Sequence, residues 1–389
     1  SNMTYLKTHL KSSKLVNTLF LVVILFTMTN CGEDEIVINT TSDFETFIRE
    51  EMEFQRIPTL SALIFKNDAV LYQGLYGQSD IEQDISLQPS HSFMLASISK
   101  TITATALVQL YDQGLFSLDD DINNHLPFTV AIPNQAKAIT FRKLLTHTSG
   151  IADGNAVDDQ YYFGEDSPIA LKDFLRNYLS TAGNLYDAAD NFYNFSPGTQ
   201  SEYSNVGNAL IGLLVEEISN QEFNAYCKQH IFSPLGMEST FWRLDEALAS
   251  ENTVVRPYEW KNGGHSPLDH YTFTDYPNGG LRSTALDLSK FLTAFANNGV
   301  ANGYQLLKSA TVQEMLSLQI PALDSETGLH FFKLNATYNL WGHDGGEQGV
   351  STIMAINPDT QVGVVLLANL EDVDLDTILI EAYRLGLSL

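Results

Sequence analysis

Residues 93–100 read FMLASISK and place Ser97 and Lys100 three positions apart, at the point where an apolar helical pattern begins. The helical spacing of the following apolar residues continues to Leu110, and Gly114 is suited to end the helix. Residues three apart lie on one face of a helix, so we expect the two side chains to meet. A serine at a helix N-terminus also lies near unpaired backbone N–H groups, which can stabilise an oxyanion.

Two interpretations of this pair are open: a helix cap followed by a solvated lysine, or a nucleophile with a helper cation. A Ser-x-x-Lys pair is expected by chance about once in a chain of this size. Lys100 is, however, the only lysine with a serine three positions before it, and no acidic residue lies between Ser92 and Tyr111 to pair with it. A buried, charged lysine beside a serine would lower the pKa of the base that deprotonates it.

Strand patterns lie near both ends of the chain. Residues 60–77 contain two strand-like runs around Lys66-Asn67-Asp68, and the runs 350–356 and 362–368 flank Asn357-Pro358-Asp359, so each pair predicts a hairpin. Helical patterns cover 209–218, 286–295 and about 377–387, and 151–200 is typical of a long loop. The order predicts an antiparallel sheet formed by the two ends, with a helical insertion between them.

The acidic composition argues against one class of partner. The chain has 21 Lys and Arg against 47 Asp and Glu, a net charge of −26. Nucleic-acid phosphates would be repelled by such a surface, so we expect no nucleic-acid partner. The nine histidines include no His-Glu-x-x-His pattern, and we expect no metal and no cofactor.

The first thirty-one residues have the layout of an export signal. Lys7, Lys11 and Lys14 precede the short apolar run 19–28, and Cys31 follows shortly after it. We expect export to the periplasm or cell surface, with lipidation at Cys31 as a membrane anchor; plain secretion with an incidental cysteine is the alternative. Cys227 then has no partner, so no disulfide is expected, and its surroundings predict a helix-core residue.

The Ser97–Lys100 pair, taken with later motifs, resembles the penicillin-binding proteins and serine β-lactamases, which combine S-x-x-K with two further elements. In the branch similar to class C β-lactamases the second element is Tyr-x-Asn, and Tyr203-Ser204-Asn205 stands after a Pro-Gly turn and before an apolar helix. A second Tyr-x-Asn, at 276–278, leads into a separate segment that also resembles the family. His343-Asp344-Gly345 resembles the third element and stands in the position of K-T-G. It precedes the second predicted hairpin, so it would lie on an edge strand that faces the serine.

The resemblance implies a role for each of these residues. Ser97 would be the nucleophile that forms an acyl-enzyme, and Tyr203 the general base, with Lys100 as its cationic neighbour. Asn205 would position Lys100 and the substrate amide. The backbone N–H groups of Ser97 and Gly346 would form the oxyanion hole. His343 and Gly345 would contact the substrate.

His343 departs from the β-lactamase pattern, which has a lysine there, and is more similar to related DD-peptidases, D-aminopeptidases and esterases. A histidine is largely neutral at pH 7 and gives a weaker field for a substrate carboxylate. We therefore expect an exported serine hydrolase acting as a D-amino-acid peptidase (DD-carboxypeptidase or D-aminopeptidase) or esterase on a small-molecule or peptide acyl substrate, including cell-wall peptide. A true class C-like β-lactamase and a non-catalytic penicillin-binding or sensor module are the alternatives, and a spacer role for His343 is also open.

The resemblance implies an α/β (α+β) fold that is β-lactamase/transpeptidase-like, an antiparallel sheet flanked by helices with an inserted mainly helical domain. The corresponding segments are a signal and lipoprotein segment over 1–31, an acidic tether over 32–45, a sheet domain over 46–115 plus 275–389, and the inserted domain over 116–274. Three further residues have expected roles. His147 is expected to pin a loop and Asp119 to begin a solvated turn. Arg282 is expected to lie at the surface, with contact to a substrate carboxylate as the alternative.

Overall fold

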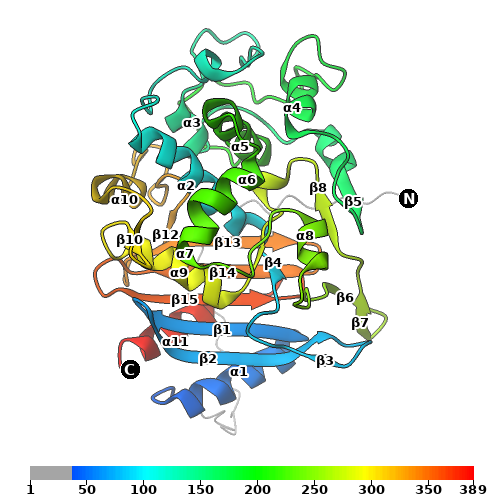
Figure 1. The fold of residues 1–389 in the computed structure, drawn as a ribbon, viewed down its shortest axis with the longest axis vertical. Coiled ribbons are helices and arrows are strands. Elements are labelled where there is room, and N and C mark those ends of the chain that lie inside the picture. The colour runs from blue at the N-terminus through cyan, green and yellow to red at the C-terminus, as the bar shows by residue number, and fades with distance from the viewer. Residues whose placement is uncertain (1–36) are drawn as a thin grey trace, which may run out of the picture. The chain divides into compact units, whose positions relative to one another are not determined.

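Seven strands pair into one antiparallel sheet that is built from both ends of the chain (Figure 1). The computed structural model describes residues 37–389. The strand order is β12-β13-β14-β15-β1-β2-β3. The strands are β1 (Thr59–Lys66), β2 (Ala69–Asp80), β3 (Ile85–Ser86), β12 (Phe332–Asn335), β13 (Leu340–Glu347), β14 (Val350–Ile356) and β15 (Val362–Ala368).

Both predicted hairpins are confirmed, at β1–β2 and β14–β15. The register of β15 against β1 runs from Leu60 opposite Ala368 to Lys66 opposite Val362, so the last strands of the chain close onto the first. The predicted helices are also present, as α5 (Asn205–Ser219), α9 (Ala285–Phe295) and α11 (Asp376–Gly386).

The sheet has a covered face on each side, because successive side chains of a strand point in opposite directions. Leu60, Ala62 and Ile64 pack on one side in a cluster with α1 (Thr41–Gln55) and α11. Leu63 and Phe65 pack on the other side with α2 (Ser99–Asp112) and α9. This burial on both faces explains why the strands were visible in the sequence as nearly continuous apolar runs.

Most of the remaining helices lie on the α2 side of the sheet, and the β6–β7 hairpin (residues 258–267) lies at the strand ends beside β3 (Figure 1). The helices are α3 (Phe141–Leu145), α4 (Leu171–Leu179), α6 (Phe223–Cys227), α7 (Ser233–Leu235), α8 (Leu244–Ala249) and α10 (Ser309–Met315). The other strands form two-stranded sheets. The pairs are β4 (Phe93–Met94) with β9 (Arg282–Ser283), β5 (Tyr161–Phe163) with β8 (Tyr271–Phe273), β6 (Tyr258–Lys261) with β7 (Gly264–Pro267), and β10 (Val300–Ala301) with β11 (Tyr304–Gln305).

Residues 116–274 contain the helices α3 to α8 together with the strands β5 to β8. The largest apolar cluster includes Leu210 of α5, Ile102 of α2 and Val365 of β15, so one core continues across the predicted domain boundaries. The division at those boundaries therefore stays a prediction.

Two expectations concern residues that the structure does not describe. The signal segment and the proposed lipidation site Cys31 lie before residue 37. Within residues 37–389, no helix has the length and apolar character needed to cross a membrane.

Candidate active site

Ser97 lies on a short turn of 3₁₀-helix, Ala96–Ile98, that leads directly into α2. The turn is held from two directions: the Leu95 N–H donates to the Leu281 carbonyl at 2.9 Å, and the Leu95 carbonyl accepts from Thr352 Oγ1 at 2.6 Å. Ala96 has a φ of 52°, a left-handed conformation that is rare for a residue with a side chain. Such a backbone is retained where the surroundings fix it, and here it presents Ser97 at the start of a helix.

Lys100 is completely buried and forms the predicted contact with Ser97. Its Nζ lies 3.0 Å from Ser97 Oγ and 2.7 Å from the backbone carbonyl oxygen of Asn278. Burial lowers the pKa of Lys100 from 10.5 to about 7, against the attraction of nearby carboxylates led by Asp153. Lys100 is therefore poised to gain or lose a proton near neutral pH, beside the serine hydroxyl.

Tyr203 lies over the same lysine. The Lys100 Nζ is 4.8 Å from the centroid of the Tyr203 ring. The Tyr203 ring also packs on the ring of His147, with 4.4 Å between the two centroids. Part of the tyrosine is open to solvent, with 39 % of the residue exposed. Desolvation nevertheless raises the pKa of Tyr203 above 10.0, and the Ser97 hydroxyl opposes this effect. Of the two neighbours of Ser97, Lys100 rather than Tyr203 is thus the stronger candidate to be deprotonated near pH 7.

Asn205 begins α5 but is bonded to a residue that the sequence did not single out. Its Nδ2 donates to Asp153 Oδ2 at 3.0 Å, and the backbone N–H groups of Asn205 and Val206 also donate to this carboxylate, at 3.2 and 2.9 Å. A carboxylate at a helix N-terminus satisfies free N–H groups and interacts favourably with the helix dipole. Asp153 therefore fixes the Tyr203-Ser204-Asn205 segment, while Lys100 itself bonds to Ser97 and Asn278 and not to the Asn205 amide.

The strand β13 passes beside the serine. It pairs with β14 along its length but with β12 only up to Gly342, so residues 343–347 form a free edge of the sheet. A side-chain carbon added at Gly345 would lie only 2.9 Å from the Ser97 backbone nitrogen, whereas one added at Gly346 would meet open space. Only glycine permits this approach of strand to turn, and it brings the Ser97 N–H and the Gly346 backbone to the same opening.

His343 is buried behind this edge, with 2 % of its surface exposed. Its Nδ1 lies 2.5 Å from the carbonyl oxygen of Asp344, and its Nε2 has no hydrogen-bond partner among the described residues. Burial, together with the charge of Lys100, lowers the pKa of His343 to about 3. His343 is therefore uncharged throughout the physiological range.

Two further histidines pack around Tyr203. The Nδ1 of His147 accepts a hydrogen bond from the Ser204 N–H at 3.1 Å, so the predicted loop-pinning role of His147 is confirmed. His330 stacks on His147 with 4.5 Å between ring centroids. Burial lowers the pKa of both histidines well below 6.5, so the wall behind Tyr203 and Lys100 consists of neutral rings.

Two carboxylates complete the surroundings of Lys100. Asp275 is 2 % exposed and accepts from Asn278 Nδ2 at 2.5 Å, and burial raises the pKa of Asp275 to about 7. Glu347, at the end of β13, accepts from the Tyr161 hydroxyl. The second Tyr-x-Asn, at 276–278, was thus a signal of the site: it supplies the carbonyl that holds Lys100.

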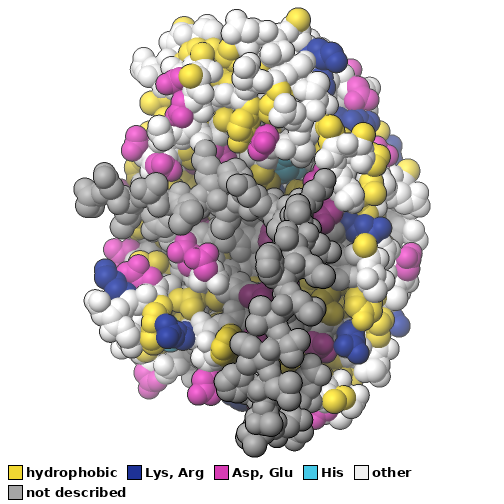
Figure 2. All heavy atoms as spheres, turned by 180° about the vertical axis from the view of Figure 1, so that it is seen from behind, with side chains coloured by type: hydrophobic (Ala, Val, Ile, Leu, Met, Phe, Trp, Pro, Cys, Tyr) yellow, Lys and Arg dark blue, Asp and Glu magenta, His cyan; other side chains and the backbone are white. Residues whose placement is uncertain are grey.

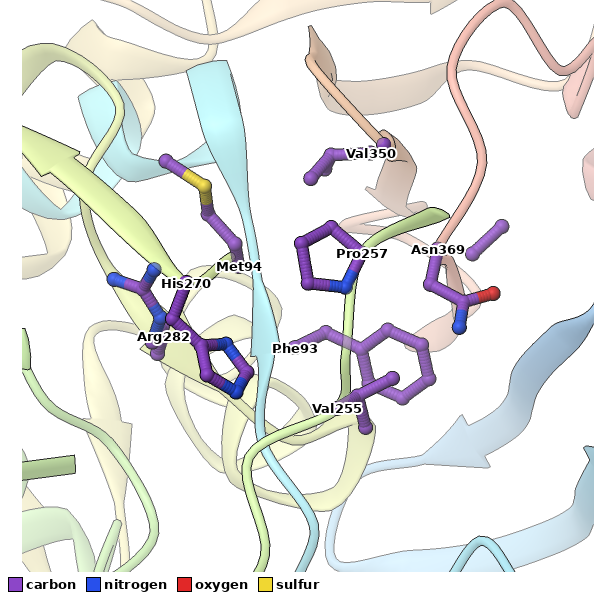
Figure 3. A pocket seen from close by; sticks show the side chains of 10 residues that line it. Phe93, Met94, Val255, Pro257, His270, Arg282, Val350 and Asn369 are labelled. Carbon is purple, nitrogen blue, oxygen red and sulfur yellow. The ribbon is translucent and has the colours of Figure 1, made fainter. Parts of the chain in front are cut away.

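Arg282 is not a surface residue, so that prediction was wrong: only 1 % of it is exposed, because β4–β9 pairing places it inside the protein. It lines a cavity of about 10 Å³, room for about one water molecule (Figure 3). Cys227 is fully buried at the end of α6, so the predicted helix-core position is confirmed. Asp119 lies in an exposed turn but is paired with Arg142 at 2.9 Å. No group of three candidate metal ligands occurs within residues 37–389.

The turn, the buried lysine, the tyrosine and the glycine edge together form the arrangement expected of a β-lactamase-fold serine hydrolase. The family model described as Beta-lactamase matches residues 44–386, and the chain belongs to this family. It is 25 % identical over 338 residues to Protein flp of Staphylococcus aureus (strain MW2), covering 85 % of this chain and 64 % of flp. The chain thus spans slightly less than two thirds of that relative.

Solved structures share the fold. The octameric penicillin-binding protein homologue from Pyrococcus abyssi superposes with a TM-score of 0.69 at 24 % identity, over 89 % of this chain and 76 % of that one. A class C beta-lactamase gives a TM-score of 0.68 at 18 % identity, over 89 % of this chain and 95 % of that one. These structures confirm the predicted mixed fold with its large antiparallel sheet, and the family model confirms the predicted family.

Proposed function

We propose that the protein is an exported hydrolase that cleaves a small ester or a D-amino-acid peptide through an acyl-enzyme on Ser97. The observation that carries the proposal is the contact of 3.0 Å between Lys100 Nζ and Ser97 Oγ, beneath the opening formed by Gly345 and Gly346. A buried amine with a pKa of about 7 is a suitable general base at neutral pH, because catalytic pKa values work best near the operating pH.

In the proposed reaction, neutral Lys100 takes the proton of Ser97 Oγ as the oxygen attacks the substrate carbonyl carbon. The backbone N–H groups of Ser97 and Gly346 stabilise the oxyanion. Collapse of this intermediate breaks the bond to the leaving group. That group receives the proton of the Tyr203 hydroxyl, and Lys100 passes on the proton it took from Ser97, so that Tyr203, whose pKa is raised, stays protonated. Water then attacks the acyl carbon and gives a proton to Lys100. Collapse breaks the bond to Ser97 Oγ, which receives that proton as the acid product leaves.

True β-lactamase activity is the second candidate, and the family membership favours it. Against it stands the neutral, buried His343, which offers no positive charge to the carboxylate that β-lactam antibiotics carry. The binding or sensor alternative is weakened by the intact contacts among Ser97, Lys100 and Tyr203.

Intact-mass analysis tests the proposal. The protein and Ser97→Ala are incubated separately with a fluorophosphonate and a penicillin. We expect Ser97-dependent labelling by the fluorophosphonate, with neither a lasting adduct nor turnover of penicillin. A stable penicillin adduct would instead indicate a penicillin-binding peptidase, and rapid penicillin turnover a β-lactamase. Absence of any Ser97-dependent adduct or turnover would refute the hydrolase.

The membrane anchor at Cys31 is a separate proposal that rests on the sequence pattern. Metabolic labelling with palmitate, beside Cys31→Ala, tests it. Label on the wild-type protein but not on the variant is expected, and an unlabelled wild-type protein would end the idea.

A further inference from the structure

The site is rich in carboxylates for the amount of positive charge that it holds. Four acidic groups act on Lys100: Asp153, Asp275, Glu347 and Asp344. Within residues 37–389, no lysine or arginine nitrogen lies within 4 Å of any of them, and the histidine beside Asp344 is neutral. Acidic side chains are also spread over the face of the protein seen in Figure 2. A substrate that brings a positive charge would therefore be attracted to this opening, and an anionic one repelled.

Glu347 is the carboxylate best placed to meet a substrate. It lies two residues after Gly345 on β13, so its side chain points to the same face of the strand. That face contacts Ser97, because a side-chain carbon at Gly345 would lie 2.9 Å from the Ser97 nitrogen. Two residues of strand span about 7 Å. Glu347 is therefore about 7 Å along the strand from Gly345, the residue that contacts the Ser97 turn, and it directly follows Gly346.

The carboxylate of Glu347 is held in place without being neutralised. The Tyr161 hydroxyl donates to both of its oxygens, at 2.8 and 3.0 Å, and the Gln348 N–H donates to one at 3.3 Å. Tyr161 is itself fixed by its edge contact with the Phe273 ring, 5.4 Å between centroids. These neutral donors orient the carboxylate but leave its negative charge without a cation, and they leave the side chain partly open to solvent.

The opposite end of the edge is different. His343 is neutral and buried, and Tyr203, which protonates the leaving group in the proposed reaction, lies 6.3 Å from it between ring centroids. A carbonyl bound between Ser97 and Gly346 therefore directs its leaving group toward Tyr203 and its acyl substituent along β13 toward Glu347. The acyl end of the substrate therefore lies near the Glu347 carboxylate, which has no lysine or arginine nitrogen within 4 Å among the described residues.

We propose that Glu347 binds the free ammonium group of the acyl part of the substrate. The substrates are then esters or amides of amino acids whose amino group is unblocked, and the enzyme releases residues from an amino end and not from a carboxyl end. This inference rests on the proposed function, since it concerns the same acyl site.

Paired substrates test the role of Glu347. The kcat/KM values for D-alanine p-nitroanilide and N-acetyl-D-alanine p-nitroanilide are compared in the wild-type protein and in Glu347→Gln, with p-nitrophenyl acetate as an uncharged reference. We expect the wild-type protein to prefer the free amine. Because Glu347 also acts on Lys100, the variant can lose some activity on every substrate, but the free amine should lose about 10- to 100-fold more than the acetylated substrate and the ester, the size usual for a hydrogen bond to a charged group. Glu371→Gln is the matched control: it removes an exposed carboxylate that interacts electrostatically with Glu347, from the loop after β15.

A binding measurement separates failure of this inference from failure of the hydrolase. D-alaninamide and N-acetyl-D-alaninamide are titrated calorimetrically into Ser97→Ala, with and without Glu347→Gln. Tighter binding of the free amine that is lost with Glu347 supports the inference even if no turnover is found. Equal binding of the two amides, or a preference that survives Glu347→Gln, overturns it. Ser97-dependent turnover of p-nitrophenyl acetate would then leave the hydrolase standing without this specificity.

Discussion

Replacing Lys100 by methionine should stabilise the fold while abolishing activity. The lysine is completely buried, and its ammonium group has two hydrogen bonds, to Ser97 Oγ and Asn278 O, with no carboxylate within 4 Å among the described residues. Methionine fills a similar volume without a charge. Exchanging a buried charge for an apolar group of similar shape is often neutral or stabilising.

The magnitude follows from the pKa of Lys100. A fall from 10.5 to about 7 means that the protonated side chain costs the folded state about 5 kcal/mol at acidic pH, at 1.36 kcal/mol for each pH unit. This is a ceiling, because the variant leaves the Asn278 carbonyl and Ser97 without a partner. We expect Lys100→Met to raise the free energy of unfolding at pH 6 by about 1–4 kcal/mol.

The gain must depend on pH in one direction. Below pH 7 Lys100 is protonated in both the folded and unfolded chains, and the full cost is present. Between pH 7 and 10.5 the unfolded chain holds one more proton than the folded chain, so the stability of the wild-type protein increases with pH. The advantage of Lys100→Met should therefore shrink between pH 7 and 10.

Urea denaturation at pH 6 and pH 9 measures both effects, with Lys137→Met, at an exposed lysine, as the control. Equal pH dependence of Lys100→Met and the wild-type protein would contradict the low pKa. Destabilisation of Lys100→Met at pH 6 by more than about 1 kcal/mol would show that the lost hydrogen bonds outweigh the charge.

Three predictions concern the catalytic step. The kcat/KM of the wild-type protein on a neutral ester should rise with pH through about 7 to a plateau, because neutral Lys100 is the base; a profile that falls through pH 7 would assign the base to another group. Asp153→Asn should lower kcat about 10-fold or more and shift the rise of the pH profile to lower pH, since Asp153 raises the pKa of Lys100. A lower kcat without a shift of the pH profile would leave Asp153 only a structural role. His343→Gln should leave the shape of the profile between pH 5 and 8 unchanged, because His343 with a pKa of about 3 is neutral throughout; a lost titration would refute that state.

The parts of the fold that the sequence predicted are those in which burial requires a run of apolar residues. The strands β1 and β15 are covered on both faces, so they stand out as apolar runs in the sequence. The burial of Lys100 was one of two open interpretations, and the lack of an acidic partner in its segment counted against a solvated lysine. In both cases the prediction depended on the residues of one continuous segment.

The parts of the site that escaped prediction arise between distant segments. Asp153 lies 52 residues before the Asn205 amide that it binds, and Asn278 lies 178 residues after Lys100. The Asn278 contribution is a backbone carbonyl, which every residue possesses and no motif can mark. Arg282 was misjudged for a related reason, since its burial follows from the pairing of β9 with β4 and not from its neighbours in sequence.

Burial and the nearby carboxylates act on the pKa of Lys100 in opposite ways. Burial lowers the pKa of Lys100, and the histidines nearby are neutral, so they bring no charge that would oppose this effect. The carboxylates, led by Asp153, raise that pKa again from a distance, without forming the direct ion pair that would keep the amine protonated. A pKa of about 7 is the balance of the two effects, and it serves a base that must be half deprotonated at neutral pH. The same carboxylates leave the opening negatively charged, so the groups that tune the base also favour a cationic substrate at Glu347.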